Sequence, residues 1–99
     1  MKIIYHPEVE KVIRSLPKED ETRVLKIVDL FVDYAFHLPP KYLKKVERNI
    51  WEFRAGRYRV LFGMVEGNTV LVNIFMKKTQ KTPKREIDLA HRRIKQYEE

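Results

Sequence analysis

The chain has 99 residues, of which 43% are hydrophobic and 11% aromatic, which suffices for one modest core and not for a second domain. It contains no cysteine, which excludes disulfides, thiolate catalysis and cysteine-ligated zinc and fits a reducing compartment. The net charge of +7 favours a polyanionic partner such as nucleic acid. We predict a single domain over residues 1–99. Because no long apolar run occurs, we expect a cytoplasmic protein without a signal peptide or membrane span.

The N-terminal half reads as one short strand followed by two helices. Residues 2–5 suit a strand, and Pro7 suits the first position of a helix because its missing N–H is not needed there. Apolar residues then repeat at helical spacing until Pro17. The acidic run 19–21 suits the positive N-terminal end of a second helix, which stops before Pro39–Pro40.

The C-terminal half reads as three strands and a helix. From about Asn49 the pattern becomes strand-like, and Gly56 and Gly67–Asn68 mark two turns. Helical spacing returns from Pro83. The order β-α-α-β-β-β-α predicts an α+β fold with a mostly antiparallel four-stranded sheet. The two N-terminal helices should cover one face of this sheet and the C-terminal helix the other.

Two-residue loops at Ala55–Gly56 and Gly67–Asn68 predict the register of both hairpins, and directly paired residues share a face. Glu52 then faces Arg59, and Arg57 faces Arg54 and Lys78. The face predicted to lie under the first two helices carries Trp51, Phe53, Tyr58, Val60, Phe62, Met64, Leu71 and Phe75. The opposite face is predicted to carry Glu52, Arg54, Arg57, Arg59 and Lys78 at one end, with Leu61, Val72 and Ile74 beyond them.

The positive charge is concentrated in two segments. Residues 41–59 hold seven Lys or Arg against two Asp or Glu, and residues 77–97 hold eight against two. Like charges opposite one another on a sheet are destabilising, so the cluster predicts an anionic ligand. Arginine presents a planar fork that matches phosphate oxygens, which favours a phosphodiester. The alternative is an ordinary ion pair between Glu52 and Arg59, with the other cations only keeping the protein soluble.

The runs NIWEFRAGRYRVLFG and FMKKTQKTPKREIDLA, together with the element order, resemble the RelE/ParE superfamily of type II toxins, in particular its phage-derived, HigB-like branch. The resemblance implies a ribosome-dependent mRNA endonuclease, with the ribosome and mRNA as partners. It also implies a cognate helix-turn-helix antitoxin, HigA-like, that holds the toxin inactive. The implied reaction needs no metal and no cofactor: the RNA 2′-OH attacks the adjacent phosphorus and the 5′-oxygen leaves.

The same resemblance assigns roles to individual residues. Arg59 in RYRVLF matches the family's arginine at the scissile phosphate, and Glu52 and Arg54 in WEFR match a base and a phosphate-binding residue. Lys78 and Lys81 lie where relatives keep a basic residue and a tyrosine or histidine, which this chain lacks there. Glu52 or Lys78 would act as the base and Lys78 or Lys81 as the acid. RNA or ribosome contacts are expected from Arg57, Lys77, Gln80, Lys84, Arg85, Arg92, Arg93 and Lys95.

Other functions remain open on the sequence. His6, His37 and His91 have no second ligand at i+2 to i+4, so we predict no metal site and favour capping or packing roles. The basic C-terminal helix is short of large apolar residues, which favours packing on the sheet over membrane binding. A ParE-like gyrase poison without RNase residues and a plain nucleic-acid-binding module are the two rival functions. An antitoxin could fill the arginine site or bind the helical side, and we favour the second.

Overall fold

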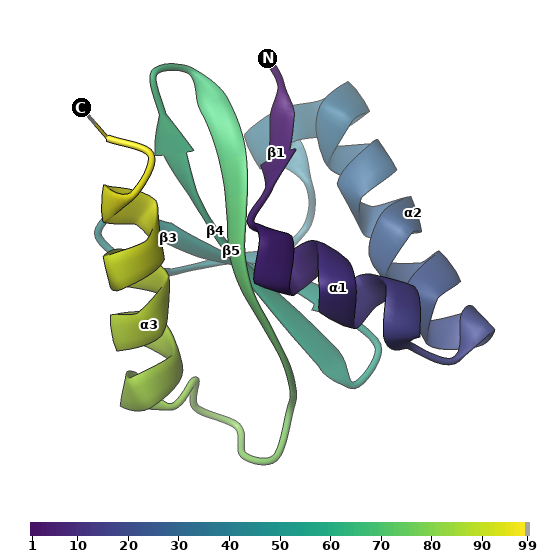
Figure 1. Ribbon diagram of the computed structural model, residues 1–99. Helices are drawn as coiled ribbons and strands as arrows, with labels where there is room; N and C mark the ends of the chain where they lie inside the picture. The colour runs from purple at the N-terminus through teal and green to yellow at the C-terminus, as the bar shows by residue number, and fades with distance from the viewer. Residues whose placement is uncertain (99) are drawn as a thin grey trace.

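The computed structural model describes residues 1–98, so the last residue of the predicted domain lies outside the described residues. In Figure 1, α1 and α2 lie on one side of a central sheet and α3 lies on the other. The elements in chain order are β1 (Ile3–Tyr5), α1 (Pro7–Ser15), α2 (Lys18–Tyr34), a short 3-10 helix η1 (Ala35–His37), β2 (Leu43–Glu47), β3 (Ile50–Ala55), β4 (Tyr58–Val65), β5 (Asn68–Met76) and α3 (Lys84–Lys95).

The sheet has five strands in the order β1-β5-β4-β3-β2. β1 pairs with β5 in parallel, and the other pairs are antiparallel, which confirms the predicted α+β fold and mostly antiparallel sheet. The difference is β2, an edge strand that the sequence pattern did not reveal. Of its five residues only Leu43 is buried, and short, charged edge strands lack the apolar alternation that marks a strand.

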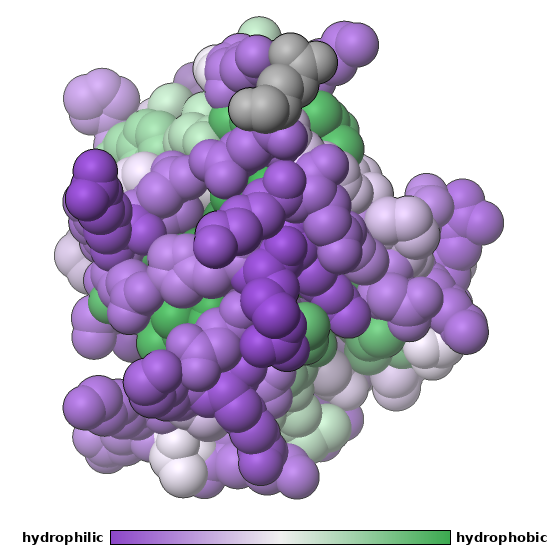
Figure 2. All heavy atoms as spheres, turned by 60° about the vertical axis from the view of Figure 1, so that its left-hand side comes forward, coloured by the Kyte–Doolittle hydropathy of each residue, from purple (hydrophilic) through white to green (hydrophobic). Residues whose placement is uncertain are grey.

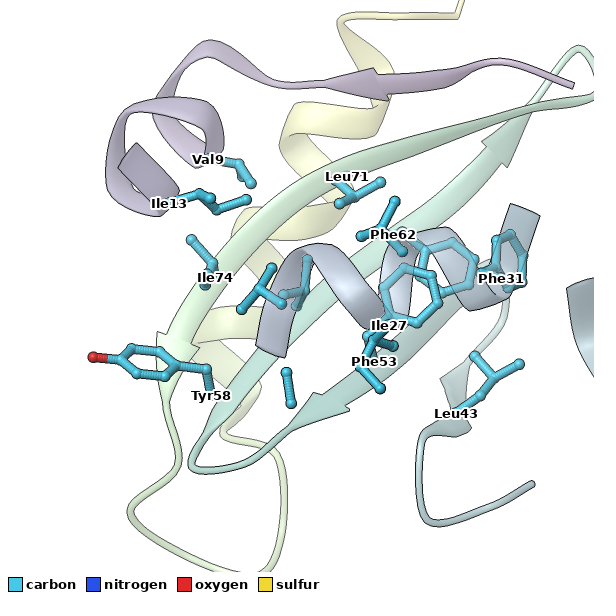
Figure 3. Close-up of a cluster of buried hydrophobic side chains, with 14 of the residues drawn as sticks. Val9, Ile13, Ile27, Phe31, Leu43, Phe53, Tyr58, Phe62, Leu71 and Ile74 are labelled. Atoms are coloured by element: carbon cyan, nitrogen blue, oxygen red, sulfur yellow. The ribbon is translucent and has the colours of Figure 1, made fainter. Parts of the chain in front are cut away.

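The larger core lies between the sheet and the helices α1 and α2 (Figure 3). Phe31 of α2 meets Phe53 of β3 edge-on, with ring centroids 5.1 Å apart, and Phe53 stacks on Phe62 of β4 at 4.4 Å. On the opposite face, Ala90 and Ile94 of α3 pack against apolar side chains of the same strands. The central strand β4 is therefore covered on both faces, as the predicted helix positions require.

The first hairpin turn lies one residue beyond its predicted place. Gly56–Arg57 is the loop, because Ala55 pairs with Tyr58 and Arg54 with Arg59. The predicted pairing of Glu52 with Arg59 was therefore wrong by two residues. Side chains alternate between faces with a period of two, so this error leaves each strand residue on its predicted face.

The second hairpin differs more from the prediction. Its loop is Glu66–Gly67, and both residues have positive φ, 52° and 79°, as a type I′ turn requires. The register shifts by one between Leu61 and Phe62. Beyond that bulge, Ile74 packs in the α1/α2 core and Phe75 against the α3 core, which reverses the predicted faces of both residues.

Candidate nucleic-acid interface

Two arginines lie side by side at the end of the sheet nearest the loop of residues 77–83. Arg54 of β3 and Arg59 of β4 are direct partners in the register, and Glu52 shares their face. Facing like charges are destabilising unless an opposite charge compensates them. Glu52 is only 3% exposed, and its Oε2 accepts a hydrogen bond from Arg54 Nε at 3.3 Å. The alternative of an ion pair between Glu52 and Arg59 was therefore wrong, because Glu52 pairs with Arg54 of its own strand.

The main chain fixes the buried guanidinium of Arg59. Its Nη1 donates to the carbonyl oxygens of Gly56 at 2.8 Å and Tyr58 at 2.9 Å. Burial lowers the pKa of Arg59, while Glu52 raises this pKa and Arg54 lowers it. The group still stays charged at neutral pH, because arginine is not deprotonated in proteins. Arg59 therefore presents a cation whose position is set before any ligand arrives.

The loop of residues 77–83 forms one wall of the site. Thr82 Oγ1 donates to Glu52 Oε1 at 2.8 Å, so each oxygen of the Glu52 carboxylate accepts a hydrogen bond. Thr79 Oγ1 donates to the carbonyl oxygen of Lys81 at 2.7 Å and holds the loop in shape. A small pocket results, lined by Glu52, Arg59, Phe75, Pro83 and the whole segment 77–82.

A cationic groove continues from this pocket toward the edge of the sheet. The two share the segment 80–82, and the groove has a volume of about 180 Å³. Among the described residues, none of those that line it is acidic: they are Lys44, Lys45, Val46, Arg54, Gln80, Lys81, Thr82 and Ile87. Sequence reasoning missed Lys44 and Lys45 because it did not find β2.

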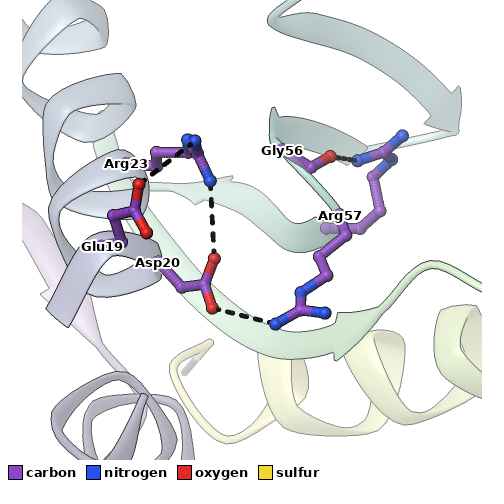
Figure 4. A network of polar contacts seen from close by, with 6 residues as sticks. Glu19, Asp20, Arg23, Gly56 and Arg57 are labelled. Atoms are coloured by element: carbon purple, nitrogen blue, oxygen red, sulfur yellow. Dashed lines mark hydrogen bonds and ion pairs between the residues drawn. The ribbon is translucent and has the colours of Figure 1, made fainter. Parts of the chain in front are cut away.

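Most of the predicted site residues meet here. Glu52, Arg54 and Arg59 come together through the hairpin, and the loop brings Lys77, Lys78, Gln80 and Lys81 to the same pockets. Arg57 does not join them, so its predicted placement was wrong. It lies in the turn, where its Nη2 is 3.4 Å from Oδ2 of Asp20 in α2, and Figure 4 shows Asp20 between Arg57 and Arg23.

Some of the predicted RNA-contacting cations of α3 are held by partners within the protein, and others are exposed. Arg93 Nη1 donates to the carbonyl oxygen of Val72 at 2.9 Å, which holds this side chain on the sheet. Lys84 pairs with Asp88 at 3.0 Å, and Arg85 is 3.7 Å from Glu86. Arg92 and Lys95 are exposed. Figure 2, with the α3 side turned forward, shows a mainly hydrophilic surface.

Two polar residues that position the site were not predicted. Thr82 carries the hydrogen bond to Glu52, and a threonine in a polar loop gives no signal of such a role. Asn73 Nδ2 donates to the carbonyl oxygen of Glu86 at 3.1 Å and to its Oε1 at 2.9 Å, which ties β5 to the first turn of α3. A polar residue inside the apolar run 69–76 was a usable signal, because buried polar groups are normally hydrogen-bonded.

Two of the three histidines, His6 and His91, have structural contacts. His6 Nδ1 accepts a hydrogen bond from the backbone N–H of Glu8 at 3.1 Å and caps α1. Capping was one of the two roles predicted for the histidines. His91 of α3 pairs with Glu47 of β2. In residues 1–98 there is no group of three or more His, Cys, Asp or Glu that could hold a metal ion. Over the same range, no helix is both long and apolar enough to cross a membrane.

The chain resembles known proteins in sequence and in fold. A family model described as "Phage derived protein Gp49-like (DUF891)" matches residues 11–95. The fold is similar to a chain of the archaeal RelE–RelB complex from Pyrococcus horikoshii, with 23% identity and a TM-score of 0.66 over 77% of this chain and 93% of that chain. It is also similar to a chain of the RelB–RelE antitoxin–toxin complex from Methanococcus jannaschii, with 13% identity and a TM-score of 0.61 over 74% and 88%. The comparison with curated proteins found no match.

Proposed function

The chain belongs to the phage-derived Gp49-like family, a RelE/HigB-type toxin family, and we propose that this RelE-like toxin is a ribosome-dependent mRNA endonuclease. One observation carries the proposal: Arg54 and Arg59 face each other directly on neighbouring strands beside a single buried carboxylate, and three lysines of the adjoining loop line the same pocket or its groove. Such an excess of fixed positive charge suits a phosphodiester, and above all the additional charge of a pentacoordinate phosphorane.

The proposed reaction is a transesterification. The 2′-oxygen of one nucleotide forms a bond to the adjacent phosphorus, the bond from phosphorus to the 5′-oxygen breaks, and the products end in a 2′,3′-cyclic phosphate and a 5′-OH. A base takes the 2′ proton and an acid gives a proton to the 5′-oxygen. Arg59 and Arg54 would bind the non-bridging oxygens, because preorganised donors stabilise charge that develops in the transition state.

The contacts of Glu52 favour a positioning role over that of base. It is buried, and its two oxygens already accept hydrogen bonds from Thr82 and Arg54. Because Glu52 is only 3% exposed, the remaining lone pairs of these oxygens have little access to a 2′-OH. In our proposal Glu52 holds Arg54 and the loop in place, and the proton transfers fall to the exposed Lys78 and Lys81.

The test uses purified ribosomes programmed with mRNA and maps new 5′ ends. The protein should cleave this mRNA and leave free mRNA intact, and a 2′-deoxy substitution at the cleaved nucleotide should stop the reaction. Arg59→Ala should reduce the rate by on the order of a hundredfold or more. Arg48→Ala, at an exposed arginine outside the pocket, is the matched control and should cleave normally. Ribosome binding without new 5′ ends would refute the nuclease and leave a nucleic-acid-binding module.

A second part of the proposal concerns an antitoxin that silences the protein. Both similar structures are of RelE in complex with RelB. We propose a helix-turn-helix, HigA-like antitoxin that binds the helical side, where Val12 of α1 and Leu25 of α2 are 37% and 38% exposed. Amide protection on titration with the product of the adjacent gene tests this. Protection limited to residues 52–59 and 77–82 would place the antitoxin in the arginine site instead.

A further inference from the structure

Arg54 of β3 lies beside the point where the edge strand β2 begins. β2 begins at Leu43. The carbonyl oxygen of the preceding residue, Tyr42, accepts a hydrogen bond from the backbone N–H of Arg54 at 2.8 Å. The Arg54 side chain, 30% exposed, lines the cationic groove on the α3 side. It also lines a separate pocket on the α2 side of the sheet. Arg54 therefore borders two cavities, one on each face of the sheet, and its Nε is bound to Glu52 on the α3 side.

The pocket on the α2 side combines an apolar floor with a cationic rim. It has a volume of about 260 Å³ and lies between α2, the residue before β2 and the β3–β4 turn. Ile27, Leu30 and Tyr42 supply the apolar surface, while Arg23 and Lys26 supply the cations. Within the described residues, no carboxylate lines this pocket.

Packing and an ion pair hold Arg23 in position beside the pocket. Arg23 lies across the turn, where a Cβ on Gly56 would be 3.3 Å from Arg23 Cδ, and its Nη1 is 3.7 Å from Asp20. The Nζ of Lys41 is 4.9 Å from the ring centroid of Tyr42 and adds a further cation beside the pocket. Lys26 is exposed and free to follow a ligand.

We propose that this pocket is a second nucleotide subsite, in which a base stacks on Tyr42 while Lys26 contacts an adjacent phosphate. The inference rests on the proposed function, since it adds a second nucleotide to the RNA held at the Arg59 pocket, beyond the edge of the sheet at Arg54. An aromatic ring beside a basic rim is the pattern by which proteins hold single-stranded nucleic acid. The lack of carboxylates removes the repulsion that a phosphate would otherwise meet.

The first experiment measures binding of a fluorescent 2′-O-methyl hexaadenylate to the free protein by anisotropy. The 2′-O-methyl groups prevent cleavage, so binding is observed alone. Tyr42→Leu should weaken binding by about fivefold or more, because loss of one stacked base costs at least about 1 kcal/mol. Tyr42→Phe keeps the ring and should bind like the unaltered protein. Equal affinity for the Leu and Phe variants would overturn the subsite.

Salt dependence tests the phosphate contact. Lys26→Ala should reduce the slope of log K against log salt by about 0.7, the value for one phosphate contact on a single strand. Lys11→Ala, at an exposed lysine of α1 outside the pocket, should leave the slope unchanged. Equal slopes for both variants would refute the contact. A hexaglutamate peptide that bound as tightly as the RNA and competed with it would assign the pocket to an acidic peptide instead.

The cleavage assay separates this inference from the proposed function. If Tyr42→Leu and Lys26→Ala bind the hexaadenylate normally while Arg59→Ala alone stops cleavage, the nuclease stands and the subsite fails. If the unaltered protein never cleaves but the two subsite variants weaken binding as described, the subsite stands and the nuclease fails.

Discussion

Gly63 of β4 lies directly against Ile94 of α3, and Gly63→Ala tests that packing. A Cβ at residue 63 would overlap Cδ1 of Ile94 and would lie 2.8 Å from the carbonyl oxygen of Asn49. The Ile94 side chain can shift, but the Asn49 oxygen belongs to the backbone. Overpacking of this kind costs about 1–3 kcal/mol, so we expect the free energy of unfolding to fall by about 2 kcal/mol. For a domain of this size, the melting temperature should fall by roughly 8–16 °C.

A double-mutant cycle identifies the cause. Ile94→Val removes Cδ1 and by itself should cost about 0.5–1.5 kcal/mol. If the overlap with Ile94 causes most of the loss, the double variant should lose less stability than the two single variants do in sum, by about 0.5 kcal/mol or more. Urea denaturation of the four proteins measures this. Strict additivity would assign the cost to the Asn49 carbonyl oxygen instead, and a Gly63→Ala protein as stable as the unaltered one would refute close packing of α3 on β4.

Three further perturbations address stability, pH and ribosome binding. Asp20→Asn weakens the junction between α2 and the β3–β4 turn and removes a charge from the first turn of the helix, and should cost about 1 kcal/mol by thermal melting. Burial, reinforced by nearby carboxylates, raises the pKa of Tyr5. The folded state thus holds this proton more tightly than the unfolded state, so stability should fall as pH rises above about 10, and less steeply in Tyr5→Phe. Reversing the charges of Lys84, Arg92 and Lys95 together should weaken co-sedimentation with ribosomes and reduce its salt dependence.

Each of these perturbations has a matched control. Glu19→Gln, at an 88% exposed side chain of the same helix turn, should change the melting temperature little. Tyr34→Phe, at an exposed ring, should leave the alkaline loss of stability as it is. Reversal of the exposed Lys2, Lys11 and Lys18 should leave ribosome binding intact. If a control variant changes the measured quantity as much as its test variant does, the corresponding explanation is wrong.

Much of the candidate site could be predicted from the sequence, because side chains keep their face of the sheet when the register is wrong by an even number of residues. Glu52, Arg54 and Arg59 were assigned to one face from a turn placed one residue too early. The pairing was wrong by two residues, which returns every strand side chain to the same face. The second hairpin shows the limit of this reasoning. Its bulge shifts the register by one, which exchanged the predicted faces of Ile74 and Phe75.

By itself, the sequence determined the order of the elements other than η1 and β2, most of the two apolar faces and the segments that carry the excess positive charge, because these follow from periodicity and composition along the chain. Only the tertiary structure decided that Arg57 pairs with Asp20, that Thr82 binds Glu52 and that Lys44 borders the groove. The first two contacts join residues 37 and 30 positions apart, and the third depends on an edge strand with one buried residue. Contacts of this kind leave no periodic trace in the sequence, because they form only after the apolar faces have brought distant segments together.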